Sequence, residues 1–138
     1  MMNASDLVKW YEGLADGVRA ETEGEILDQA LALLQSNYIV AAAVLAGGAL
    51  ETHLRHLAIT KYGLTVIGDG TISEYDAVVA QARNSGALTT YGATDSKLIA
   101  GWGGIRNEAT HSPVFFVRSS DDVRRMIEGI RGFMARTS

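Results

Sequence analysis

The sequence has no cysteine, only one proline and no apolar run long enough to cross a membrane. The lack of cysteine excludes disulfides and thiolate metal sites, and a reducing cytosol is the compartment most easily reconciled with it. The most apolar stretch, residues 39–50, is too short to span a bilayer and runs directly into Glu51. The first six residues lack the basic patch and apolar run of a secretory signal. We therefore expect a cytoplasmic protein with no membrane partner.

The length and composition are those of one globular domain. With 138 residues, of which 47% are hydrophobic and 20% charged, the chain is long enough to bury one core and does not have a disordered composition. No internal repeat, low-complexity tract or proline-rich linker divides it. The sequence therefore predicts a single domain over residues 1–138.

The net charge is −4, and the charges are distributed unevenly along the chain. Residues 1–105 hold six basic and twelve acidic side chains, a net charge of −6, whereas residues 106–138 hold six basic and four acidic ones, a net charge of +2. An acidic chain argues against a broad nucleic-acid-binding face with many phosphate contacts. The C-terminal cations are all arginines, whose planar guanidinium groups suit phosphate oxygens; ordinary ion pairs on solvated helix faces are the alternative for most of them. They are Arg106, Arg118, Arg124, Arg125, Arg131 and Arg136.

The apolar spacing is helical almost throughout, and the period-two alternation of strands is absent from the sequence. The strongest patterns are the long stretch Tyr38–Lys61, which we expect to be the central core helix, and the apolar stripe from Val123 to Met134 in the last helix. The sequence therefore predicts an all-α fold, a compact bundle of five or six helices. The other helices are expected over residues 6–19, from 22–25 through 34, over 74–85, and from 94 or 95 to 111 or 112.

Short polar motifs mark where the predicted helices begin and end. Ser73 is expected to cap the helix over 74–85, with Asp76 at the capping-box position. Pro113 disfavours helical backbone at the preceding residue, so Ser112 is the expected end of the next helix. His111 then lies in the last turn, where a cation is favoured by the helix dipole. His111 therefore has a structural explanation as well as a functional one.

Three polar side chains that could take part in catalysis lie in the last part of that helix: Arg106, Asn107 and His111. Asn107 and His111 are four residues apart and project about 40° from each other, so they share a helix face. Arg106 lies about 140° from His111 around the same helix, so one helix alone makes a poor site. Two copies related by a two-fold axis would instead enclose a cleft lined by guanidinium and imidazole groups. Such a cleft suits a phosphodiester.

The octet Gly-Ile-Arg-Asn-Glu-Ala-Thr-His at residues 104–111 resembles the R-N-x-x-x-H signature of the HEPN superfamily. The helix before the motif and the long helix over 41–57, with its Leu-Ala-Gly-Gly-Ala-Leu-Glu core, are similar to that family's layout, so the resemblance covers most of the chain from Glu25 onward. It implies a four-helix up-and-down core with extra short helices, and a homodimer. It also implies, for catalytically active members, a metal-independent endoribonuclease. Many such members are toxins paired with a nucleotidyltransferase antitoxin or act in phage defence.

The chemistry of RNA cleavage assigns a role to each residue of the motif. Attack by the 2′-hydroxyl of the RNA needs a group that exchanges a proton near neutral pH, for which His111 is the candidate. Arg106 is a permanent bidentate donor for the charge that builds up on the phosphate. Asn107 is expected to orient the imidazole or to bind the phosphate. No cofactor is implied. The alternative is a non-catalytic module whose helix end binds a nucleotide or protein partner or forms the dimer.

Glu51 and Arg118 are further candidates for binding the substrate. Glu51 lies on the central helix, where it is also spaced for an ion pair with Arg55. Arg118 is one of the C-terminal arginines suited to phosphate. Inside the motif, Glu108 places a negative charge close to the expected anion site.

Two other features each have a structural explanation. His53 and His56 are three residues apart, but no carboxylate cluster or further histidine completes a metal-ligand set, so we expect surface or satisfied core positions and no metal. The glycines at 101, 103 and 104 each cost helix stability of about 1 kcal/mol relative to alanine. They indicate either a closely approaching backbone, such as that of a dimer partner, or a bend that packs Trp102 inward.

Overall fold

The structure, a computed structural model, describes residues 3–4, 23–65, 70–84 and 91–137. Within these ranges the secondary structure is helical and no strand occurs, which confirms the predicted all-α fold. The helix expected over residues 6–19 lies outside the described residues. The elements are α2 (Glu23–Gln35), α3 (Ile39–Arg55), the π-helix η2 (His56–Lys61), α4 (Ile72–Asn84), α5 (Ala93–His111), the 3₁₀ turn η3 (Pro113–Phe115) and α6 (Ser120–Thr137).

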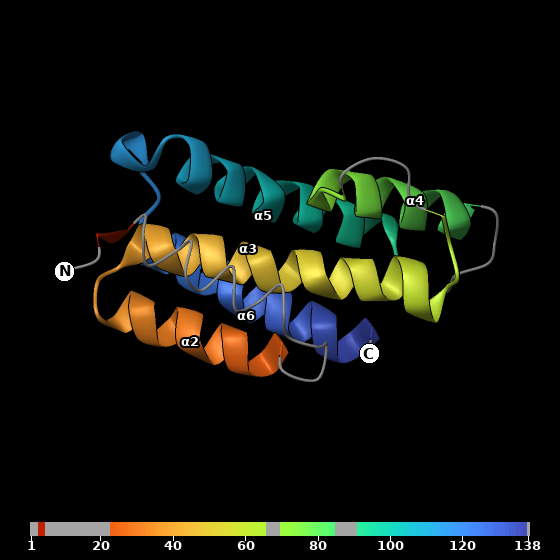
Figure 1. The fold of residues 1–138 in the computed structure, drawn as a ribbon, viewed down its shortest axis with the longest axis horizontal. Helices are drawn as coiled ribbons and strands as arrows, with labels where there is room; N and C mark the ends of the chain where they lie inside the picture. Colours follow the sequence, from red (N-terminus) through yellow and green to blue (C-terminus); the bar gives the residue numbers. More distant parts are fainter. Residues whose placement is uncertain (1–2, 5–22, 66–69, 85–90, 138) are drawn as a thin grey trace.

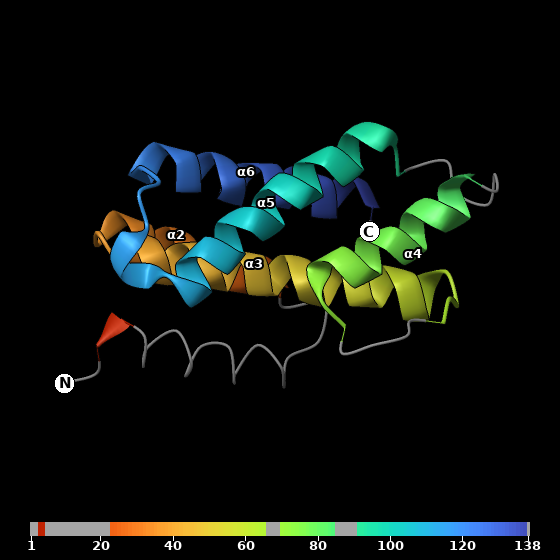
Figure 2. The same cartoon turned by 90° about the horizontal axis from the view of Figure 1, so that it is seen from above.

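Four of the helices form an up-and-down bundle. α2, α3, α5 and α6 alternate in direction, and the shorter α4 packs against α5 and against α3 near its C-terminal end (Figures 1 and 2). α3 lies in the middle and contacts α2, α4, α5 and α6. None of the helices in the described ranges combines the length and the apolar character that crossing a bilayer requires.

α3 is the central core helix because, as far as Leu50, its side chains are small or apolar on every face. Alanines at 41–43, 46 and 49 are buried, and Leu50 and Leu54 are fully enclosed. The predicted helix over Tyr38–Lys61 is thus confirmed in extent, but its last six residues form η2. There the backbone N–H of Tyr62 donates to the carbonyl of Leu57 at 2.9 Å.

α6 also follows its predicted pattern. All six residues of the apolar stripe are buried: Val123, Met126, Ile127, Ile130, Phe133 and Met134. Ser119 caps the helix, since its Oγ accepts the backbone N–H of Asp122 at 3.1 Å and its own N–H donates to the Asp122 carboxylate at 3.1 Å. This reciprocal capping box explains why the helix begins at Ser120.

The predicted start of α4 was wrong by two residues. Thr71, not Ser73, is the cap, because its Oγ accepts the backbone N–H of Glu74 at 3.2 Å. Asp76 does not take part in capping. Its carboxylate accepts hydrogen bonds from the hydroxyl groups of Tyr91 and Ser96, the latter at 3.0 Å. Burial, followed by the hydrogen bond to Asp76, raises the pKa of Tyr91. Asp76 therefore holds α4 on the start of α5.

α5 begins at Ala93, one residue before the predicted start. Asp95 accepts the backbone N–H of Gly92 at 2.7 Å and two hydrogen bonds from Arg136 at 2.6 and 3.2 Å. Burial of the Asp95 carboxyl opposes its ionisation, but these donors outweigh it and hold its pKa below the usual value. The start of α5 is thereby tied to the end of α6.

Candidate functional site

The motif residues lie on the C-terminal half of α5, which runs without a break to His111. The predicted boundary is confirmed, because Ser112 leaves the helical region with φ −138° and ψ 56° and Pro113 opens η3. A Cβ built at Gly101 or Gly104 would meet no other atom within 4 Å, whereas one built at Gly103 would lie 3.3 Å from Ile72 of α4. The α5 helix runs unbroken through these glycines, and Trp102 is buried.

Asn107 and His111 project into solvent from adjacent turns of α5. Both side chains are exposed, as is Gly104 one turn earlier. Within the part of the chain that the structure describes, no hydrogen bond or ion pair to either side chain is found. The two polar groups are therefore accessible to a ligand from outside the chain.

Arg106 points the other way, toward α3. Its Nη1 lies 2.7 Å from Oε2 of Glu51, and the two side chains are 23% and 19% exposed. Glu51, expected as a substrate contact, is thus placed beside the motif as the carboxylate partner of Arg106. Arg55, four residues after Glu51 on α3, donates from Nε to the hydroxyl of Tyr75 at 3.1 Å.

Gly47 makes room for Arg106 on the surface of α3. A Cβ built at Gly47 would lie 2.5 to 2.7 Å from Cγ, Cδ and Cβ of Arg106. The Cβ of Arg106 is fixed to the α5 backbone, so this overlap cannot be relieved by rotating the side chain alone. Gly47 therefore sets both the separation of α3 and α5 and the direction of the guanidinium group.

Replacing Gly47 by alanine is expected to destabilise the fold despite the higher helix propensity of alanine. The neighbouring Gly48 is the matched control, because no other atom lies within 4 Å of a Cβ built there. Gly48→Ala should raise the free energy of unfolding by up to about 1 kcal/mol, whereas Gly47→Ala should lower it. Urea unfolding monitored by circular dichroism measures both, and equal stabilisation by the two variants would contradict the packing described.

Glu108 and Arg118 form an exposed ion pair at the end of the bundle. Arg118 donates from Nε and Nη2 to the two carboxylate oxygens of Glu108, both at 3.0 Å. These hydrogen bonds lower the pKa of Glu108 and raise that of Arg118. The negative charge that Glu108 brings to the motif is thus paired with a guanidinium group, which places Arg118 next to α5.

Exposed apolar side chains follow the motif directly. Val114, Phe115 and Val117, in and after η3, are 86%, 79% and 88% exposed. Scattered apolar residues are common on protein surfaces, but several large ones within four consecutive positions are typical of a contact surface. The end of α5 thus has polar groups and an uncovered apolar segment side by side.

His53 is a satisfied core residue, as predicted. It is buried, with Nδ1 2.8 Å from the carboxylate of Glu23 and Nε2 2.8 Å from the hydroxyl of Thr137. A carboxylate, imidazole and hydroxyl in a row have the geometry of a nucleophilic triad, but all three side chains are enclosed. This row therefore serves packing. Its two outer members were not predicted, because residues so far apart in sequence give no local signal.

Among the described residues no group of three or more His, Asp and Glu side chains is arranged to hold a metal ion. Comparison with known proteins adds no relative, since no family model, curated protein or solved structure matches this chain.

Proposed function

We propose that the chain is a metal-independent endoribonuclease that acts as a homodimer in the cytoplasm. The observation that supports it most directly is the exposure of Asn107 and His111 on adjacent turns of one helix end, in the R-N-x-x-x-H order. A toxin or phage-defence role, with a nucleotidyltransferase antitoxin as partner in the toxin case, belongs to the same proposal.

The reaction is an attack by the 2′-hydroxyl oxygen of the RNA on the adjacent phosphorus. The P–O bond to the 5′-oxygen of the next nucleotide breaks, which leaves a 2′,3′-cyclic phosphate and a 5′-hydroxyl. One imidazole takes the proton of the 2′-hydroxyl, and a protonated imidazole supplies one to the leaving oxygen. Two copies of His111 facing each other provide both groups, and Arg106 stabilises the additional negative charge on the phosphate.

A second copy of the chain would complete the site. In one chain the guanidinium group of Arg106 is turned toward Glu51, while His111 is open to solvent. The exposed apolar side chains of Val114, Phe115 and Val117 lie next to His111 and offer a surface that a second copy would cover. The bare backbone at Gly104, on the same face of α5, would allow a close approach.

The direct test is incubation of the purified chain with total RNA in the presence of EDTA. We expect cleavage to persist, with products that end in 2′,3′-cyclic phosphates, because no step uses a metal. Sedimentation velocity of the same preparation should show a dimer. Absence of cleavage with and without added divalent cations would overturn the proposal, and cleavage by a strict monomer would overturn the composite site.

The exposed apolar segment after the motif also favours a second candidate, a non-catalytic module that binds a protein partner through the same helix end. This candidate predicts a dimer or complex that leaves RNA intact in the EDTA assay.

A further inference from the structure

The segment after the motif, residues 114–117, holds apolar side chains outward on a fixed backbone. Within this apolar segment Phe116 packs against the hydrophobic core, whereas the other three side chains are 79% to 88% exposed. The turn η3 shapes its start, and Arg118 after its end is held to Glu108 of α5 by two hydrogen bonds of 3.0 Å. A surface that is fixed at both ends loses little conformational freedom when a partner covers it.

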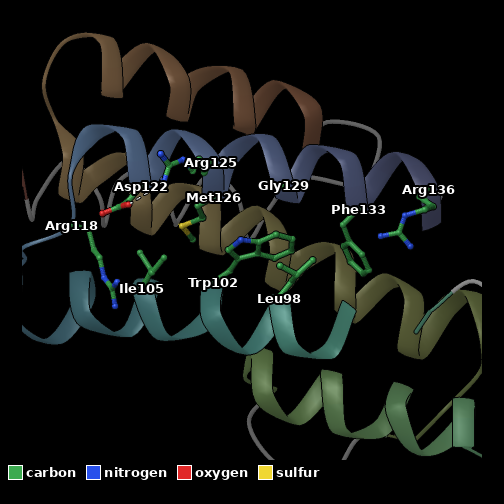
Figure 3. Close-up of a pocket in the computed structure, with 10 residues that line it drawn as sticks. All are labelled: Leu98, Trp102, Ile105, Arg118, Asp122, Arg125, Met126, Gly129, Phe133 and Arg136. Atoms are coloured by element: carbon green, nitrogen blue, oxygen red, sulfur yellow. Dashed lines mark ion pairs between the residues drawn. The ribbon is translucent and has the colours of Figure 1, made fainter. Parts of the chain in front are cut away.

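The same chain has a groove with an apolar floor between α5 and α6 (Figure 3). It encloses about 370 Å³, within the range of ligand sites. The rings of Trp102 and Phe133 line it but are buried. The apolar side chains open to a partner are those of Leu98, which is 45% exposed, and of the half-buried Ile105. The open part of the floor is therefore aliphatic and suits packing against valine and phenylalanine side chains.

The apolar segment and the groove are neighbours on the chain. Arg118 directly follows the segment, and it lines the groove at the end near Ile105 (Figure 3). Both surfaces therefore lie toward the end of the bundle where α5 ends and α6 begins (Figure 1). The segment leaves the groove of its own chain open, because its three outward side chains are exposed. A two-fold axis beside this end would place each segment on the groove of the other copy and close the assembly at two chains.

We propose that two copies of this chain exchange these surfaces, so that the apolar segment of each copy lies in the groove of the other. This inference rests on the homodimer of the proposed function and gives that homodimer its contact surface. The three exposed side chains present on the order of 400 Å². They cover a similar area of the groove, and a two-fold axis makes the contact twice, so the buried total is on the order of 1,600 Å². That is the usual size of a stable interface between proteins.

The charges around the two surfaces favour a second copy as the partner. Three arginines line the groove, against one acidic residue, Asp122. The side chain of Arg125, one of these arginines, is 77% exposed, and that of Asp121, four positions after the apolar segment, is 75% exposed. Each copy thus has an accessible cation at its groove and an accessible anion beside its segment. The exchange of segments therefore brings opposite charges together twice.

Cross-linking tests which surfaces meet, because the chain has no cysteine of its own. Phe115→Cys and Leu98→Cys are made as separate variants, mixed and oxidised under mild conditions. We expect a disulfide-linked dimer, since a disulfide forms only where the two Cα atoms approach within about 7 Å. The second contact of that dimer keeps both wild-type surfaces. Ile59→Cys is the matched control for Leu98→Cys, because Ile59 is 47% exposed but lies in η2, outside the groove lining. Its mixture with Phe115→Cys should give only background cross-linking.

Sedimentation over a range of concentrations tests the strength of the contact. Phe115→Asp and Leu98→Asp should each weaken the dimer by about tenfold or more, because each places a charge in both copies of the contact. Ile59→Asp should leave the dimer unchanged. A mixture of Phe115→Asp and Leu98→Asp should form a tighter dimer than either variant alone, since one segment and one groove in the mixed pair are both wild type. Circular dichroism of each variant checks that its helices are intact.

A wild-type monomer at every concentration would overturn the inference, as would a dimer that neither aspartate variant weakens. Equal cross-linking of Phe115→Cys to Leu98→Cys and to Ile59→Cys would also overturn it. If the wild-type monomer instead binds a different protein through Phe115, the apolar segment belongs to that partner and the inference is wrong. Cleavage of RNA in EDTA is read separately. Cleavage by a dimer that Phe115→Asp does not weaken removes this interface and keeps the nuclease, whereas a cross-linked dimer that leaves RNA intact keeps the interface and removes the nuclease.

Discussion

Replacing His111 by alanine is expected to slow RNA cleavage by roughly 10² to 10⁴-fold, the usual contribution of a general acid or base. The imidazole is exposed at the end of α5 and has no partner within the described ranges, so its removal disturbs no packing. The expected loss is in the rate of the chemical step, because His111 moves a proton and does not anchor the RNA. Single-turnover cleavage measured against pH should change from a bell-shaped profile in the wild type to a flat one in the variant.

Thr110→Ala is the matched control for this experiment. Thr110 is exposed on the same last turn of α5 but lies outside the three motif residues. Loss of the His111 side chain from the helix end costs about 0.3–1 kcal/mol of stability at most, so assays well below the unfolding temperature separate folding from chemistry. If the Thr110 and His111 variants cleave RNA at the wild-type rate and with its pH profile, His111 has no catalytic role.

The helices α3 and α6 could be predicted because the signals that define them are local. An apolar stripe at helical spacing decides which face is buried, and Ser119 marks the start of α6 within three residues of Asp122. The start of α4 shows the limit of such signals. Ser73 and Asp76 have the spacing of a capping box, and so do Thr71 and Glu74. Which pair caps α4 depends on Tyr91 and Ser96, which bind Asp76 from α5 and the segment before it.

In the candidate site, too, the local features could be predicted from the sequence and the contacts between helices could not. Helical spacing alone places Asn107 and His111 on the same face of α5. The direction of Arg106 depends on the contact between α3 and α5, where Gly47 leaves space for its stem and Glu51 accepts its guanidinium group. The sequence does not determine which rotamer a long side chain such as Arg106 adopts, so its contact with Glu51 could not be predicted from the motif.

The buried row of Glu23, His53 and Thr137 leads to the largest expected effect on stability. The hydroxyl of Thr137 donates to the carbonyl of Phe133 at 2.7 Å, so it can only accept from Nε2 of His53. The contact of Nδ1 with Glu23 at 2.8 Å then needs a second proton, held either by the imidazole or by the carboxyl group. The row therefore contains one proton more than a neutral imidazole and a carboxylate would hold together. It joins the first residue of α2, the middle of the bundle and the last turn of α6.

His53→Leu is expected to lower the free energy of unfolding by about 3–5 kcal/mol, because it leaves the Glu23 carboxyl group buried without its partner. The double variant Glu23→Met with His53→Leu should recover much of this loss, since removing both members of a buried pair costs far less than removing one. His56→Leu is the control, because His56 is only partly buried and lies one helical turn further along. Urea unfolding of the wild type, the single variants Glu23→Met and His53→Leu and the double variant gives the coupling between Glu23 and His53 directly. Two results would show that the buried pair does not hold the three helices together. One is a loss of unfolding free energy no larger for His53→Leu than for His56→Leu. The other is a double variant whose loss equals the sum of the losses in the two single variants.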